Sequence, residues 1–367
     1  MPDAVCLADV FADMPQKAPT VIDGVLRQGH KMLLSGPSKA GKSFALMELC
    51  AAFSSGGTWF GKRCAQGPVL YVNLEIDGPS CAERFKKIFQ ATGTSGNYSG
   101  YITVWNLRGR SCTLDKLAPR IVRRAKKMGS QPIAIIIDPI YKVMTGDENS
   151  ASDMGAFCNN FDYIAQETGA SVIYCHHQSK GAQGQKSAMD RASGSGVFAR
   201  DPDAMVDITE IDMATVDEDA RTGHDGAPFE VTWITREYKT PATQKVWFDY
   251  PVHVDGTEDL KDAAAKGSAK ASKRAKDEAA KKGKAEKAAK RREVCAQAYD
   301  SCVAEGVKPT RVEVARRACE IWPEMPASVP WWNANTTESR NEDTGLVSVN
   351  HGSGKTEDYW LEPVGRQ

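Results

Sequence analysis

The sequence has no apolar run long enough to cross a membrane. Its longest runs, such as Ile133–Ile137, are of strand length, whereas a membrane-spanning helix needs about 20 apolar residues. The first residues, MPDAVCLADVFADMPQK, also lack the basic start and apolar core of a secretory signal. These absences predict a cytoplasmic protein with no membrane partner.

Clustered metal ligands are absent as well. The ten cysteines are scattered between Cys6 and Cys319 without a CxxC pair, whereas a structural zinc site needs closely spaced Cys and His. The pattern favours buried or unreactive thiols in a reducing cytosol. The composition, 41% hydrophobic and 26% charged residues, is ordinary for a globular protein.

Charge is balanced over the whole chain but unevenly distributed. Residues 261–292 hold thirteen Lys or Arg and four Asp or Glu, a net charge of +9. The Ala/Lys-rich segment 256–292 has almost no large apolar side chains, which predicts disorder or a single solvated helix. We therefore expect an N-terminal domain over residues 1–255, a basic linker over 256–292 and a small domain over 293–367.

The first 255 residues alternate between strand-like and helix-like stretches. The expected strands cover residues 31–35, 69–74, 101–105, 133–138 and 170–175, and the expected helices cover 42–52, 80–91, 114–127 and 152–168. This alternation predicts an α/β domain with a mostly parallel sheet. Two later runs, 229–235 and 245–250, predict an antiparallel hairpin at one edge of that sheet.

The last 75 residues have a different pattern. Helices are expected over 294–305, 311–321 and 328–342, followed by strands 346–350 and 358–361 around the turn HGSGK at 351–355. Three helices and a hairpin are typical of a winged helix, which places its third helix in the DNA major groove. Trp331 and Trp332 are interpreted either as core residues or as a stacking surface for bases. Five cations of this region are candidate phosphate contacts: Arg311, Arg316, Arg317, Arg340 and Lys355.

One motif predicts nucleotide binding. GPSKAGKS at 36–43 fits GxxxxGK[ST], in which small residues let backbone N–H groups approach phosphates. Lys42 is expected to reach the β- and γ-phosphates, Ser43 to bind Mg²⁺, and the following helix to direct its positive end at the phosphates. ATP and Mg²⁺ are therefore the expected cofactors. The expected binding residues are Gly36, Pro37, Ser38, Lys39, Ala40, Gly41, Lys42, Ser43 and Phe44.

Two further apolar strands end in acids. Asp138 ends the run IAIIID and is expected to hold the hydration shell of Mg²⁺, the alternative being a buried strand capped by an acid. Glu75 follows VLYVNL and is a candidate for polarising the attacking water. Asp77 is its rival for that role, and a surface position for Glu75 is the remaining alternative.

A third strand ends in two histidines. His176 and His177 close the run SVIYCHH, and neighbouring residues on a strand point to opposite faces, so the two are not expected to share one metal ion. A phosphate sensor is the favoured interpretation, with a metal site or an ordinary surface pair as alternatives.

Cations after the run 229–235 are candidates for contacting a nucleotide in a neighbouring subunit. Arg236 and Lys239 are the first choices, and Arg191 and Arg200 compete with them. The alternative is a solvated hairpin with no role in catalysis.

Taken in order, these motifs resemble a known family. The P-loop, LEID at 74–77, IIIDPI at 135–140, GDENSAS at 146–152 and YCHHQSKG at 174–181 are similar to the RecA-like ATPases of the RepA-type plasmid hexameric helicases. WFG at 59–61 also looks like that family, and residues 191–205 are similar to a loop and strand of RecA-like and DnaB-like replicative helicases. The resemblance covers residues 15–250.

The resemblance implies a homo-oligomeric ring, usually a hexamer, with ATP between subunits and single-stranded DNA passing through the centre. It assigns Glu75 as catalytic base, Asp138 as Mg²⁺ carboxylate and His177 as phosphate sensor, and it makes Ser179–Ser187 a candidate DNA-facing loop. The family's arginine finger, however, falls at Asp203 here, with Arg200 nearby but out of register.

Three functional hypotheses follow. The first is an ATP-driven motor or loader acting on DNA in replication of a plasmid, phage or other mobile element, with the basic linker and last domain on duplex DNA. The second is a regulatory or partitioning ATPase whose nucleotide state switches its assembly on DNA. The third, a small-molecule kinase, is disfavoured by the basic tail.

Overall fold

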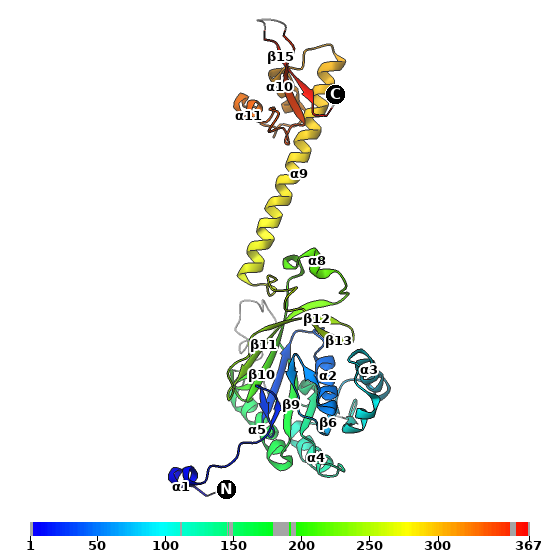
Figure 1. The fold of residues 1–367 in the computed structure, drawn as a ribbon, viewed down its shortest axis with the longest axis vertical. Coiled ribbons are helices and arrows are strands. Elements are labelled where there is room, and N and C mark those ends of the chain that lie inside the picture. The colour runs from blue at the N-terminus through cyan, green and yellow to red at the C-terminus, as the bar shows by residue number, and fades with distance from the viewer. Residues whose placement is uncertain are drawn as a thin grey trace. The chain divides into compact units, whose positions relative to one another are not determined.

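The computed structural model describes residues 3–110, 112–144, 146, 150–178, 191, 196–352 and 357–365. The chain divides into two compact units, Met1–Lys273 and Arg274–Gln367 (Figure 1). The first unit therefore continues past residue 255, where the composition changes.

The first unit is built on a nine-stranded sheet in the order β13-β12-β11-β10-β3-β9-β8-β6-β7. Its strands are β3 (Lys31–Gly36), β6 (Val69–Asn73), β7 (Ile102–Asn106), β8 (Ala134–Asp138), β9 (Ser171–His177), β10 (Ala204–Glu210), β11 (Ala227–Thr235), β12 (Gln244–Asp249) and β13 (Val252–Asp255). The six strands from β10 to β7 are parallel, and β11, β12 and β13 add antiparallel pairs at one side. The predicted α/β class and mostly parallel sheet are confirmed.

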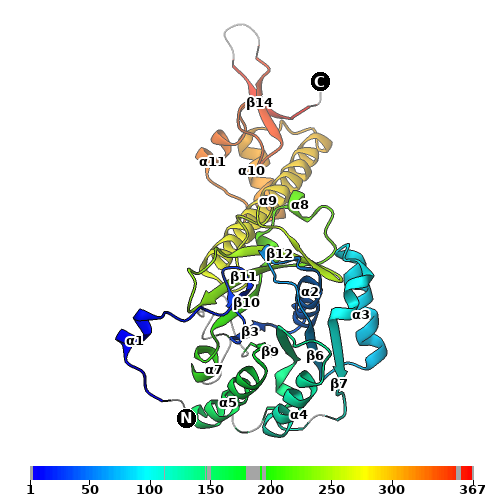
Figure 2. The ribbon, with the colours of Figure 1, turned by 60° about the horizontal axis from the view of Figure 1, so that its bottom comes forward.

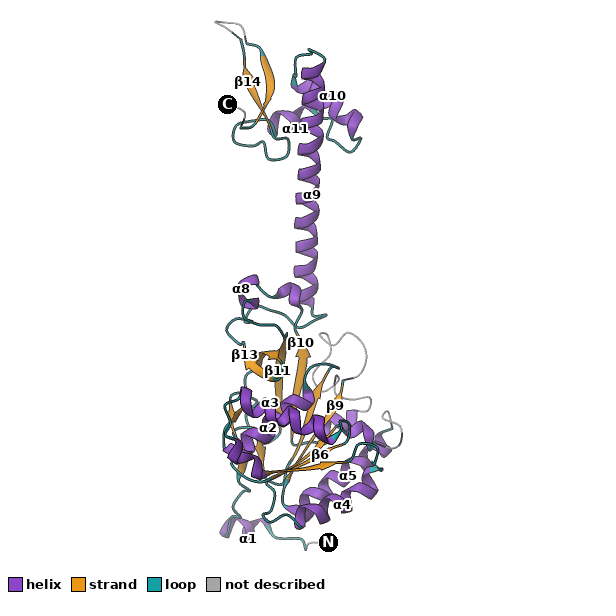
Figure 3. Cartoon of the chain, turned by 90° about the vertical axis from the view of Figure 1, so that its right-hand side faces the viewer, coloured by secondary structure: helices purple, strands orange, loops and turns teal. Residues whose placement is uncertain are grey.

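Helices cover both faces of this sheet because successive strand residues point to opposite sides. Met32 and Leu34 pack into the core beneath α2 (Lys42–Ser55) and α3 (Gly78–Ala91), whereas Leu33 packs into the core of the other face. That second core contains the buried sides of α4 (Leu114–Lys126) and α5 (Ala151–Thr168). Figure 2 and Figure 3 show the two pairs of helices on opposite sides of the sheet.

Short elements complete the first unit. They are α1 (Leu7–Ala12), β1 (Thr20–Ile22), β2 (Leu26–Arg27), β4 (Thr58–Trp59), β5 (Lys62–Arg63), α7 (Gly196–Arg200), α8 (Glu218–Arg221) and the 3-10 helices Gly96–Tyr101, Ile140–Lys142 and Met213–Thr215.

The start of the basic segment differs from the expectation of a solvated linker. Leu260 is fully buried in a small core with Trp247, Ile211 and Val216. The backbone there also bonds to the sheet, since the N–H of Lys266 donates to the carbonyl of Glu210 at 2.8 Å. The buried Leu260 and this backbone hydrogen bond together attach the stretch to the first unit.

The second unit contains three helices and a hairpin. These are most of α9 (Ala269–Ala304), α10 (Arg311–Ile321), α11 (Val329–Ala334), β14 (Leu346–Asn350) and β15 (Tyr359–Pro363), the two strands being antiparallel. The basic segment from Ala269 is helical, one of the two expected states. The core of the second unit includes Trp332, which is 1% exposed and is therefore a core residue.

The third helix is shorter than the sequence predicts. It ends at Ala334 instead of residue 342. Beyond it, the side chain of Asn335 donates to the carbonyl of Trp331 at 2.8 Å, and the Thr336 hydroxyl donates to that of Trp332 at 2.7 Å. Short polar side chains of this kind bond to the carbonyls at the end of the helix, which competes with its continuation.

Candidate nucleotide-binding site

The loop between β3 and α2 has the backbone of a phosphate cradle. Gly41, the residue before α2, has φ +70°, a left-handed conformation that favours glycine. A Cβ at Gly41 would lie 2.8 Å from the ring of Phe248, and one at Gly36 would lie 3.2 Å from Cβ of Ile208. Gly41 is therefore needed for the turn and for close packing, whereas Gly36 allows the close approach of Ile208.

Lys42 lies at the centre of the site. Its Nζ donates to the carbonyl oxygens of Gly36 at 2.9 Å and Pro37 at 2.8 Å, and it lies 3.0 Å from Nδ1 of His177. Burial lowers the pKa of Lys42, and the charges of Asp138 and Glu75 oppose that shift. The start of α2 and the ends of β6, β8 and β9 thus bring these groups together, as expected for parallel strands that share one carboxyl edge.

Asp138 is held by two buried donors that the sequence analysis missed. The Tyr71 hydroxyl donates to Oδ2 at 2.5 Å and the Cys175 thiol donates to Oδ1 at 2.9 Å, while Asp138 itself is 4% exposed. Burial raises the pKa values of Tyr71 and Cys175 well above their usual ranges, so both remain protonated donors. The carboxylate is thereby fixed in orientation with lone pairs left for a hydrated cation.

Glu75 and Asp77 have different environments. Glu75 is exposed, and its Oε1 accepts a hydrogen bond from the Tyr141 hydroxyl at 2.9 Å. Its backbone is braced by Asn73, whose Oδ1 accepts from the N–H groups of Glu75 at 3.3 Å and Ile76 at 3.1 Å. Asp77 instead caps α3 by accepting from the N–H of Ser80 at 2.9 Å. The cap gives Asp77 a structural role, which leaves Glu75 as the better candidate base.

The two histidines point apart. His176 is 8% exposed and packs on Phe198 with ring centroids 5.2 Å apart, and burial lowers its pKa to about 4. His177 faces Lys42 and lies 5.8 Å from the Tyr141 ring. Burial and then the Lys42 charge lower the pKa of His177, so it is neutral at pH 7 and its Nδ1 accepts from Lys42. Across the described residues, no group of three or more His, Cys, Asp or Glu could hold a metal ion.

Arg191 is part of a buried ion pair beside this site. Its guanidinium contacts Oδ2 of Asp207 at 2.6 and 2.7 Å, and Gln178 donates to Oδ1 of the same carboxylate at 2.8 Å. Asp207 is fully buried and Arg191 is 7% exposed. A single sequence contains no signal that pairs residues sixteen positions apart, so this network was not foreseen.

The other candidate cations lie away from the loop of the same chain. Thr235, the last residue of β11, pairs with Ala204, and Ala204 pairs with Met32 near the start of β3. Arg236 comes directly after Thr235 and therefore lies at the amino edge of the parallel strands. Gly36 is four residues further along β3, roughly 13 Å at the rise of a strand. Arg236 and Lys239 are exposed, as is Arg200. The structure does not bring these cations to the P-loop of their own chain.

Asp203 also lies at the amino edge, where its carboxylate accepts from the N–H of Lys31 at 2.9 Å. The candidate loop Ser179–Ser187 and the residues of HGSGK from 353 to 355 lie outside the described residues.

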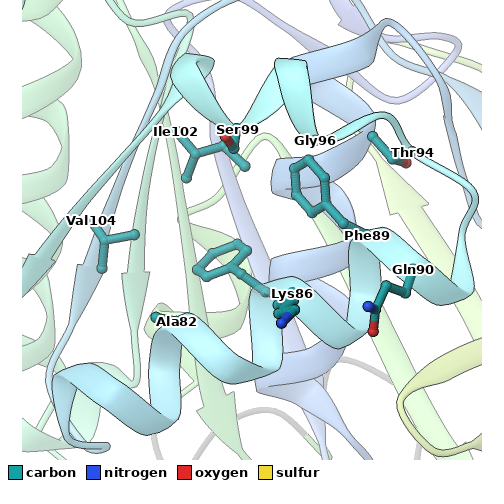
Figure 4. A pocket seen from close by; sticks show the side chains of 10 residues that line it. Ala82, Lys86, Phe89, Gln90, Thr94, Gly96, Ser99, Ile102 and Val104 are labelled. Carbon is teal, nitrogen blue, oxygen red and sulfur yellow. The ribbon is translucent and has the colours of Figure 1, made fainter.

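Features outside the P-loop edge do not add reactive groups to the site. A mostly apolar cavity of about 450 Å³ lies between α3, the 3-10 helix Gly96–Tyr101 and β7, and none of the P-loop residues line it. Figure 4 shows Phe89, Ile102 and Val104 around it. All ten cysteines are free thiols. Within the described ranges, no helix has both the length and the apolar character to span a bilayer.

The sheet and the glycine cradle define a P-loop ATPase. A family model described as an AAA domain matches residues 2–183. Together with the P-loop and the mostly parallel sheet, this match indicates an ATPase with an α/β core.

Solved structures with a similar chain path have low identity to this chain. One of them, an isolated ATPase domain, is 13% identical, with a TM-score of 0.47, over 68% of this chain and 95% of that chain. A DnaB-like replicative helicase, whose interactions with primase were described, is 14% identical, with a TM-score of 0.48, over 69% and 67%. A KaiC-like protein of Pyrococcus horikoshii is 15% identical, with a TM-score of 0.42, over 66% and 99%.

Proposed function

We propose that this protein is an ATP-driven motor acting on DNA, a helicase or helicase loader in replication of a plasmid, phage or other mobile element. The observation that carries the proposal is the convergence of Lys42, Glu75, Asp138 and His177 on the P-loop edge of one sheet. The electrostatic influence of Asp138 and Glu75 on Lys42 reflects their proximity.

In this proposal, the residues Gly36–Phe44 bind ATP, and Ser43 and Asp138 hold Mg²⁺, which neutralises phosphate charge when bound. The orientation of Asp138 by Tyr71 and Cys175 fits that role. Glu75 accepts the proton of the attacking water and is oriented by Tyr141. His177 is neutral, and its Nδ1 accepts a hydrogen bond from Lys42. Its Nε2–H is then free to donate to the γ-phosphate, so that His177 senses the loss of this phosphate.

Oligomerisation is part of the proposal. Arg236 and Lys239 are exposed at the amino edge and cannot serve their own loop without a rearrangement, so we assign them to the nucleotide of a neighbouring subunit. A ring of six is the proposed assembly, with single-stranded DNA through its centre. The free cysteines fit a reducing cytosol.

The second unit is proposed as a winged-helix-like contact to duplex DNA, together with the basic linker. Two of its candidate cations are already paired, however. Arg317 bonds to Glu305 and Glu313, and Arg316 bonds to Glu313 and Glu320. Binding through these two arginines would have to replace those pairs, so Arg340 is the better candidate of the three.

Strand displacement on a forked duplex with ATP tests the motor. We expect unwinding by the wild type and none by Glu75→Gln, which removes the proposed base while keeping its size. ATP hydrolysis by the wild type without unwinding would reject the helicase function and leave the loader function.

The alternative function is a regulatory or partitioning ATPase whose nucleotide state switches assembly on DNA. The separate second unit is consistent with this alternative, because a switch also needs a domain that docks on DNA. ATPase rates discriminate the two: single-stranded DNA should stimulate a motor most, whereas a specific duplex site or a partner protein should stimulate a switch.

A further inference from the structure

The hairpin of β12 and β13 packs against the underside of the P-loop. A Cβ on Gly41 would lie 2.8 Å from the Phe248 ring and 3.0 Å from Cε1 of His253. The rings of Phe248 and His253 are stacked with centroids 4.6 Å apart. Phe248 and His253 thus contact the P-loop although they follow it by more than two hundred residues in the sequence.

His253 bonds to the loop and to the helix after it. Its Nδ1 lies 2.7 Å from Oε1 of Glu48 on α2, and its Nε2 lies 3.2 Å from the carbonyl oxygen of Ala40. The backbone N–H of His253 also donates to the Glu48 carboxylate, at 3.2 Å to Oε2. The His253 side chain is fully buried and that of Glu48 is 11% exposed.

The His253 ring has an acceptor beside each of its nitrogens. A carboxylate oxygen faces Nδ1 and a carbonyl oxygen faces Nε2, and both groups accept hydrogen bonds. The other rings against His253 are those of Phe60 and Phe248, which are uncharged. The Glu48 carboxylate is therefore hydrogen-bonded to both the ring and the backbone of His253, which offsets the cost of its burial.

We propose that His253 and Glu48 are positioning residues that hold the P-loop in its phosphate-binding conformation. The inference rests on the assignment of Gly36–Ser43 as the ATP site. Loss of the ring would remove the contacts to both Ala40 and Glu48 and would loosen the loop. Nucleotide affinity should therefore depend on a histidine that does not touch the nucleotide.

A matched control exists in the same region of the fold. Nδ1 of His224 lies 2.5 Å from Oδ2 of Asp249, and its ring stacks on Trp247 with centroids 4.6 Å apart. This second histidine–carboxylate pair has no bond to the P-loop among the contacts of the described residues. His224→Gln removes a similar interaction without affecting the loop.

The test measures the affinity of the full-length protein for a fluorescent ADP analogue. We expect His253→Gln to bind about 10-fold more weakly than wild type, the loss for one hydrogen bond to a charged group. His224→Gln should bind the analogue as tightly as wild type.

The double variant of His253→Gln and Glu48→Ala provides a second readout, the ADP affinity per folded molecule. Glu48→Ala alone should also weaken binding, and the double variant should lose little more than either single variant, because both changes disrupt one arrangement beneath the loop. Wild-type affinity in His253→Gln, or additive losses in the double variant, would overturn the inference. Failure of the wild type to bind ADP would instead reject the proposed ATP site.

Discussion

The two edges of the parallel sheet use similar residues for different purposes. At the carboxyl edge, Lys42, Asp138 and His177 come from different elements and surround one loop. At the amino edge, Lys31 is 6% exposed and is neutralised by Asp162 and Asp201, each 2.7 Å from its Nζ. The buried Lys42 is thus placed to bind a ligand at the carboxyl edge, whereas the charge of the buried Lys31 is neutralised within the fold at the amino edge. The position of each lysine in the sheet determines its role.

The sharpest test of this comparison is the loss of each lysine in turn. Lys42→Ala should reduce the rate of ATP hydrolysis by at least about 100-fold, because it removes a preorganised cation at the phosphates. Phosphate release by the purified protein measures it. Lys86→Ala, an exposed lysine on α3, is the control and should keep the wild-type rate. A Lys42→Ala rate within about threefold of wild type would contradict the assignment of the carboxyl edge.

Lys31→Met should have the opposite profile. It leaves two partly exposed carboxylates without their cation, and we expect a loss of about 1 kcal/mol in the free energy of unfolding, because solvent screens both acids. Hydrolysis per folded molecule should be unchanged. Urea denaturation together with the ATPase rate measures both. Unaltered stability with lost hydrolysis would mean that the amino edge also takes part in catalysis.

His176, at the carboxyl edge, should make the free energy of unfolding depend on pH. Its pKa is lowered from 6.5 to about 4 by burial, so the unfolded chain binds a proton more readily than the folded chain. The free energy of unfolding should be constant above about pH 6.5 and should fall by about 2–3 kcal/mol as the pH drops to about 4. Denaturation at several pH values measures this, and His176→Asn should flatten that part of the profile. An equally steep fall in the variant would assign it to other groups.

Sequence patterns predicted the elements whose signal is local. The boundaries of α10 and β14 match those expected, and β3, β6, β8 and β9 lie within two residues of the expected runs. Each of these strands is an apolar run that ends in polar residues, so its place and its functional end could be predicted together.

Elements that depend on a distant partner were not predicted. The strand β13 is only four residues long and is stabilised by pairing with β12. Leu260 belongs to no periodic pattern and is buried by residues far away in the sequence, Trp247, Ile211 and Val216. The early end of the third helix has a local cause instead, since the side chains of Asn335 and Thr336 bond to carbonyls four residues earlier.

The sequence by itself determined the phosphate loop, the parallel sheet and the strand-end residues Glu75, Asp138 and His177, because each follows from a short pattern of residues and parallel strands share one carboxyl edge. Tertiary structure alone decided what supports them: Tyr71 and Cys175 on Asp138, Tyr141 on Glu75, and His253 with Glu48 beneath the P-loop. Hydrogen bonds require atoms within about 3 Å, and only the folded chain brings residues so far apart in sequence to that distance.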